Sequence, residues 1–149
     1  MLNHRPAAIL LAALLLLGVA QPSMANDETV WSGLVLATKA EHPKEPPVEI
    51  VKFKTKLESI FGYNQFELIG QHTEVMNDPN EQWLIPSKDF CLRVMSMTKG
   101  KDGYSFKLRL FEQKKMLADF ETKLEPQSPL FIRGPLYGGG QLIIILLAK

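Results

Sequence analysis

Cysteine and histidine are scarce in this chain. Among its 149 residues, one is cysteine and three are histidine. Because the single Cys91 cannot form a disulfide within the chain, the sequence excludes the disulfide frameworks that hold many small exported domains together. Few histidines also leave few candidates for acid–base catalysis. The fold must therefore depend on a hydrophobic core, which a chain of this length can build.

The chain also lacks an excess of charge of either sign. It has 17 basic and 16 acidic residues, and residues 1–25 contain a single charged side chain, Arg5. Residues 26–149 are therefore balanced in formal charge. A balanced chain lacks the basic footprint of proteins that bind nucleic acid or anionic membranes. We therefore predict no nucleic-acid partner.

Apolar runs long enough to cross a bilayer are absent. The longest run, Ala7–Ala20, is shorter than the roughly 20 residues that a spanning helix needs. Leu142–Ala148 is shorter still, and its residues are apolar at odd and even positions alike. This pattern is typical of a strand with both faces buried. We predict no membrane span after the N-terminal segment.

The N-terminal segment has the three parts of a secretory signal peptide. Met1–Pro6 carries a positive charge, Ala7–Ala20 is apolar, and Ser23–Ala25 places small residues before a cleavage site. The sequence therefore predicts export to the periplasm or the extracellular space. Retention of the segment as an uncleaved anchor is the alternative.

Cleavage is predicted between Ala25 and Asn26. Residues 1–25 are then the signal peptide, and residues 26–149 form one domain of a length typical of single domains.

One helix is predicted in this domain, at Val48–Phe61. Its apolar residues recur at helical spacing, Pro47 suits the start of a helix, and Gly62 suits the left-handed position after its end. The apolar stripe predicts that the helix packs one face against a sheet.

The rest of the domain reads as about six to seven strands. The strongest alternation of apolar and polar residues lies in three segments, Phe90–Thr98, Tyr104–Leu110 and Met116–Leu124. Arg133–Gly140 is predicted as a glycine-rich turn. The fold class expected is α+β: a twisted, mainly antiparallel sheet, which could curl towards a partial barrel, with one packed helix.

Charges on two of these segments predict how they pair. Lys107 and Arg109 lie on one segment, and Asp119 and Glu121 lie on the next. Opposite charges on neighbouring antiparallel strands help to set the register. We therefore expect these residues to lie opposite each other.

No recognised catalytic motif is present in the sequence. Gly138–Gly140 precedes a predicted strand rather than a helix, so it does not match a phosphate-binding loop. An enzyme alternative, a small hydrolase or a thiol enzyme, would need to assemble a site from His72, Glu74, Asp89 and Cys91.

Three sulfur-bearing residues, Cys91, Met95 and Met97, alternate along one predicted strand and should share a face. Soft sulfur ligands select Cu(I), so a copper-binding or carrier protein is one alternative. Cys91 and Met95 are roughly 13 Å apart along a strand, so one ion would need help from a neighbouring strand, from Met116 or His72. Arg93 between them disfavours a cation. No cofactor is predicted.

The favoured interpretation of the same face is an apolar patch that binds a partner. The predicted patch consists of Met95, Met97, Phe111 and Leu117. Such a patch is typical of a protein interaction site, used through apolar docking or strand addition. The partner would be another envelope protein or a second copy of the chain, and the domain would be a non-enzymatic accessory component.

Several segments resemble uncharacterised small secreted bacterial envelope proteins. These segments are Phe61–Tyr63, Phe66–Gly70, Ser128–Pro135 and Gly138–Ile144. The resemblance implies a bacterial envelope setting. It transfers no activity and no functional residues.

Overall fold

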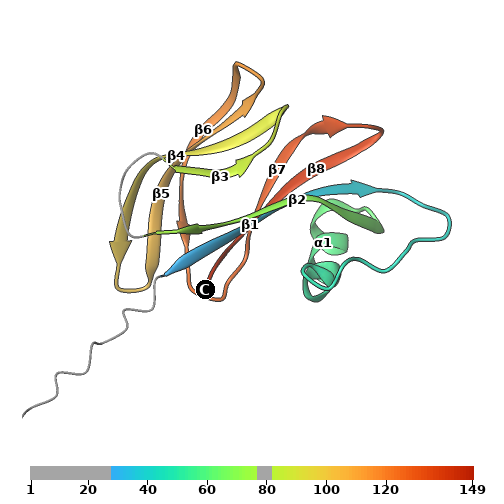
Figure 1. Ribbon diagram of the computed structural model, residues 1–149. Helices are drawn as coiled ribbons and strands as arrows, with labels where there is room; N and C mark the ends of the chain where they lie inside the picture. Colours follow the sequence, from blue (N-terminus) through green and yellow to red (C-terminus); the bar gives the residue numbers. More distant parts are fainter. Residues whose placement is uncertain (1–27, 77–81) are drawn as a thin grey trace, which may run out of the picture.

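Eight strands form two four-stranded antiparallel sheets in the computed structural model, which describes residues 28–76 and 82–149 (Figure 1). Sheet A has the order β2-β1-β8-β7, and its strands are β1 (Thr29–Thr38), β2 (Gln65–Val75), β7 (Leu130–Tyr137) and β8 (Gly140–Ala148). Sheet B has the order β3-β4-β5-β6, and its strands are β3 (Gln82–Pro86), β4 (Phe90–Gly100), β5 (Gly103–Glu112) and β6 (Lys115–Leu124). The mainly antiparallel α+β architecture is confirmed, with more strands than predicted and two sheets in place of one.

The helix is shorter than predicted. A 3₁₀ turn, η1 (Val51–Phe53), leads into α1 (Lys54–Phe61). The amide of Phe53 donates to the carbonyl of Ile50 at 2.9 Å, and the amide of Lys54 donates to the carbonyl of Val51, so each bond spans three residues as in a 3₁₀ helix. The prediction of a helix from Val48 onward is therefore wrong at its start. The predicted end is confirmed, because Gly62 has φ 73°.

Two hydrophobic cores hold three layers together. The first lies between the sheets and includes Leu34, Leu92 and Leu108. The second lies between sheet A and the helical segment and includes Val35, Phe53 and Leu57. The layers therefore follow the order helix, sheet A, sheet B.

Strand β8 contributes to both cores. Its alternate residues Leu142, Ile144 and Leu146 belong to the core between the sheets. Ile143 and Ile145 belong to the core beneath the helix. Every residue of β8 is buried, which confirms the sequence prediction of a strand covered on both faces.

The predicted turn at Arg133–Gly140 is mostly strand. β7 continues to Tyr137, and the turn consists of Gly138 and Gly139, with φ 52° and 77°. Two successive residues with positive φ make the tight hairpin turn that matches strand twist. Pro135 is tolerated because β7 is an edge strand.

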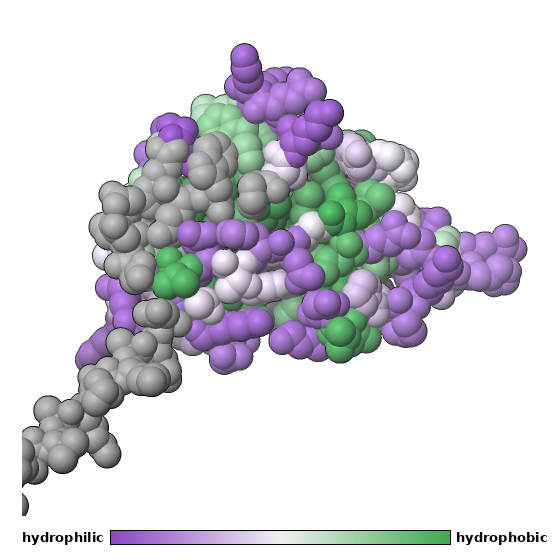
Figure 2. Space-filling model, viewed as in Figure 1, coloured by the Kyte–Doolittle hydropathy of each residue, from purple (hydrophilic) through white to green (hydrophobic). Residues whose placement is uncertain are grey.

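The helix leaves sheet B without a covering layer on its outer face. In Figure 1, α1 lies beside sheet A and away from β4, β5 and β6. Figure 2 shows polar side chains over much of the surface in this view, with apolar side chains near its middle. The outer face of sheet B is thus a sheet face on which an apolar residue, Met116, stays accessible.

Candidate functional site

The candidate site is the outer face of sheet B near the β5–β6 turn. Strand pairing arranges side chains there in rows across β4, β5 and β6. One row, here called the apolar row, consists of Cys91, Phe111 and Met116. The next, here called the charged row, consists of Arg93, Arg109 and Asp119. Met116 is 50% exposed, while Cys91 and Phe111 are half-buried.

A β-bulge in β4 changes which side chains reach this face. Val94 pairs with Leu108 and Ser96 pairs with Lys107, so Met95 is an extra residue between them. An extra residue reverses the alternation of the strand beyond it. The prediction that Cys91, Met95 and Met97 share a face is therefore wrong for Met97, which packs against the core between the sheets.

A second bulge, in β6, places Leu117 on the inner side of sheet B. Leu110 pairs with Ala118 and Phe111 pairs with Met116, which leaves Leu117 as the extra residue. Leu117 packs against the core between the sheets, so its predicted place in the outer patch is wrong. The structure keeps Phe111 on the outer face and puts Met116 beside it.

Sequence alternation could have found Met116, but not as an interaction residue. It starts the alternating segment that ends at Leu124, and simple alternation places it on the same face as Ala118, which points inward. The bulge at Leu117 reverses that phase and turns Met116 outward. Met95 lies at its own bulge in β4 and belongs to neither core cluster.

Charged side chains lie along one side of the apolar row. Arg109 Nε lies 2.9 Å from Asp119 Oδ2, and Lys107 pairs in register with Glu121. The predicted pairing of these charges is confirmed. The same face carries more basic than acidic side chains, with Arg93, Lys107, Arg109 and Lys123 against Asp119 and Glu121.

The sulfur atoms of this face are poorly arranged for a metal ion. Cys91 and Met116 lie on β4 and β6 with β5 between them, which separates their backbones by about 10 Å. Partial burial raises the pKa of the Cys91 thiol and so disfavours the thiolate that binds metals. In the described part of the chain, no three His, Cys, Asp or Glu side chains cluster in a way that could hold a metal ion.

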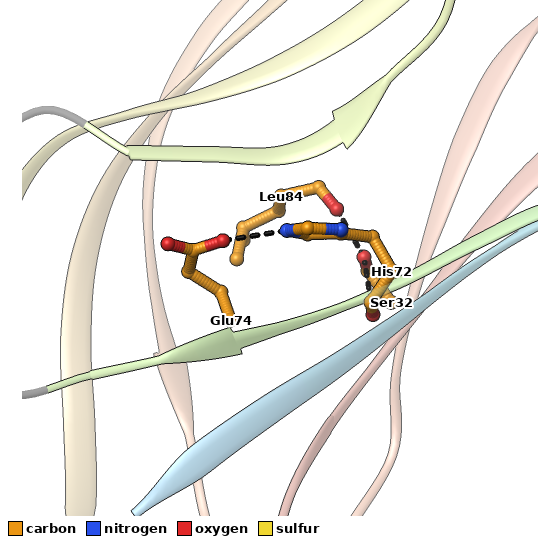
Figure 3. A network of polar contacts seen from close by, with 4 residues as sticks. All are labelled: Ser32, His72, Glu74 and Leu84. Atoms are coloured by element: carbon orange, nitrogen blue, oxygen red, sulfur yellow. Dashed lines mark hydrogen bonds and ion pairs between the residues drawn. The ribbon is translucent and has the colours of Figure 1, made fainter.

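A polar network lies where β1, β2 and β3 meet (Figure 3). His72 Nε2 is 2.5 Å from Glu74 Oε2. The fully buried Ser32 hydroxyl contacts the backbone carbonyls of His72, at 3.2 Å, and of Leu84. Ser32 therefore links sheet A to sheet B, and its hydroxyl is engaged with the backbone.

The enzyme alternative is not assembled as proposed from the sequence. His72 lies on β2 of sheet A, whereas Cys91 lies on the outer face of sheet B. His72 therefore lies next to Glu74 and not next to the thiol of Cys91. The short distance between His72 and Glu74 reflects their positions two residues apart on one strand, which places them on one face.

Comparison with known proteins identifies no relative: no family model, no curated protein and no solved structure matches the chain. Across residues 28–76 and 82–149, no helix combines the length and apolar character needed to cross a membrane. The predicted signal peptide and its cleavage site at Ala25 and Asn26 lie outside the described residues. The function must be argued from the site itself.

Proposed function

We propose that the protein is an exported, non-enzymatic interaction domain of the bacterial envelope. It binds a partner protein through the apolar row on the outer face of sheet B. Export rests on the signal-peptide pattern of residues 1–25. The observation that carries the binding proposal is an apolar row, Cys91, Phe111 and Met116, on a sheet face that no helix within residues 28–76 and 82–149 covers.

The apolar row suits protein contacts better than solvent. Phe111 and Met116 lie opposite each other on β5 and β6, and neither belongs to a core cluster. Aromatic residues and methionine are enriched at protein interfaces, and methionine adapts its shape to a partner. A partner that covers both side chains removes apolar surface from water, which favours binding.

The charges beside the apolar row indicate the chemistry of the partner. Basic side chains outnumber acidic ones on this face, with Arg109 paired to Asp119 and Lys107 opposite Glu121. The partner should therefore present an apolar centre with acidic residues at its rim. Complementary charges of this kind speed association and fix orientation, and their effect weakens as salt is added.

The edge of sheet B offers a second element of recognition at the same place. β6 is an edge strand, and Met116 lies near its start. A strand of the partner that pairs with β6 would extend the sheet, as in other cases of strand addition. The apolar row and the β6 edge are adjacent, so one partner can use both.

The test is recovery of the partner from the native envelope with the tagged full chain. Phe111→Lys and Met116→Lys place a charge in the apolar row. Ser105→Lys is the matched control, because Ser105 is exposed near the far end of the same face. We expect a specific partner whose recovery falls at least about tenfold in the two row variants and is retained in the control.

Two results would contradict the proposal. Equal recovery with all four proteins would show that binding does not use the apolar row. Recovery of only a second copy of this chain, lost in the row variants, would replace a partner protein with self-association.

A further inference from the structure

A groove lies on the opposite side of sheet A from sheet B, between the helical segment and the loop that joins β6 to β7. Its larger part is an open, solvent-facing cavity of about 500 Å³. Phe53, Pro129 and Leu147 provide apolar lining, and Lys52 and Lys56 contribute two ammonium groups. Phe53 and Leu147 are 6% and 3% exposed, so each is anchored in the core and presents a small part of its side chain to the groove.

Two lysines give this groove a positive charge. Lys52 Nζ lies 5.0 Å from the centre of the Phe53 ring, which holds its ammonium group above the apolar lining. Lys56 is four residues further on and lies on the same side of the helical segment. No carboxylate side chain lines the larger cavity. An anion placed between the two lysines would therefore meet no repulsion from the cavity wall.

The apolar lining continues beyond the lysines. A smaller cavity of about 200 Å³ shares Lys52 and Leu147 with the first and reaches Trp31 and Val48. Val48 is 81% exposed, which is unusual for a valine beside a cavity and leaves apolar surface open to a ligand. Glu49 and Lys149 also line this second cavity, so their charges offset each other there. The Lys56 end, with two lysines and no carboxylate side chain in its lining, is the favoured place for an anionic group.

We propose that this groove binds a single-chain anionic amphiphile. A carboxylate head lies between Lys52 and Lys56, and an alkyl chain runs along Leu147 and Trp31 to the exposed Val48. Charge-assisted hydrogen bonds from the two ammonium groups hold the head, and burial of the chain supplies the apolar contribution. The site is independent of the apolar row and of the partner proposed for it.

Calorimetric titration of the purified full chain with dodecanoate tests this site. We expect saturable binding that weakens about tenfold or more in Lys52→Glu and in Lys56→Glu. Lys54→Glu is the matched control on the same helical segment, because Lys54 lines neither cavity and pairs with Glu45 at 2.6 Å. Butyrate, which lacks the chain, and dodecyltrimethylammonium, which reverses the charge, should bind far more weakly.

Several results would overturn the assignment. These are absence of dodecanoate binding, equal binding of the cationic amphiphile, and equal weakening in the Lys54→Glu control. Binding to vesicles of anionic phospholipid without binding to dodecanoate would also overturn it, since a bilayer surface would then be the ligand. Circular dichroism and thermal unfolding of each variant, Lys54→Glu included, establish that the fold is intact.

Discussion

At the scale of single residues, a few polar side chains connect sheet A with sheet B, the two layers of the β-sandwich. Ser32 bridges β1 and β3 through the carbonyl of Leu84. Near the turn between β4 and β5, the hydroxyl of Tyr104 donates a hydrogen bond to Glu28, and Lys99 Nζ lies 2.8 Å from Glu28 Oε2. These contacts connect the start of β1 with sheet B.

Ser32→Ala should destabilise the fold, although the substitution removes only one oxygen atom. The carbonyl of Leu84 would lose its buried partner, and an unsatisfied buried polar group costs about 1–3 kcal/mol. Urea unfolding measures the change in free energy of unfolding. Ser105→Ala is the control at an exposed site and should change it by less than about 0.5 kcal/mol. Equal stability of Ser32→Ala and wild type would show that the bridge contributes nothing.

The ion pair of Glu28 should make stability depend on pH. Lys99, together with the hydroxyl of Tyr104, lowers the pKa of Glu28 from its ordinary value of 4.5. Because the pKa is lower in the folded state, the stabilisation is present above 4.5 and is lost as the pH falls through the folded-state pKa. Glu28→Gln should thus be less stable than wild type at pH 7 and closer to it at pH 3. Urea midpoints that differ equally at both pH values would contradict this account.

At the scale of secondary structure, the helix owes its place to one apolar stripe. Leu57 is fully buried against sheet A, whereas Ile60, three residues later, is 54% exposed. Both residues belong to the apolar pattern at helical spacing that predicts the helix over Val48–Phe61. The structure shows that the stripe is narrower than the sequence pattern, because Ile60 does not reach the sheet.

Leu57→Ala and Ile60→Ala separate these two positions on one helix. Removal of the buried leucine should cost about 2–5 kcal/mol in the free energy of unfolding, because a cavity is left beneath the helix. The exposed isoleucine should cost less than about 1 kcal/mol. Similar losses in thermal or urea unfolding for both variants would mean that the helix packs through a different face.

Sequence alternation predicted the elements well where each strand was regular. The register of Lys107 with Glu121 and of Arg109 with Asp119 followed from charge, and the buried character of β8 followed from its apolar residues. The bulges at Met95 and Leu117 could not be predicted in this way. A bulge depends on how two strands pair, and a single strand's pattern does not record it.

At the scale of the whole molecule, the sandwich has one side closed by the helix and one side left open. The sequence predicted a helix packed on a sheet but not which of two sheets it would cover, since that depends on contacts distant in the chain. The helix covers Val35 and Ile145 of sheet A, so the outer face of sheet B keeps Phe111 and Met116 accessible. The proposed partner takes the place of a second covering layer.

Site-specific photo-crosslinking in cells that export the full chain tests this central claim most directly. A photoreactive residue replaces Met116 in the apolar row, and in a separate protein it replaces Ser105 at the far end of the same face. The account predicts a discrete adduct with another protein from position 116 and little or none from position 105. Absence of an adduct at position 116, or equal adducts from both positions, would contradict it.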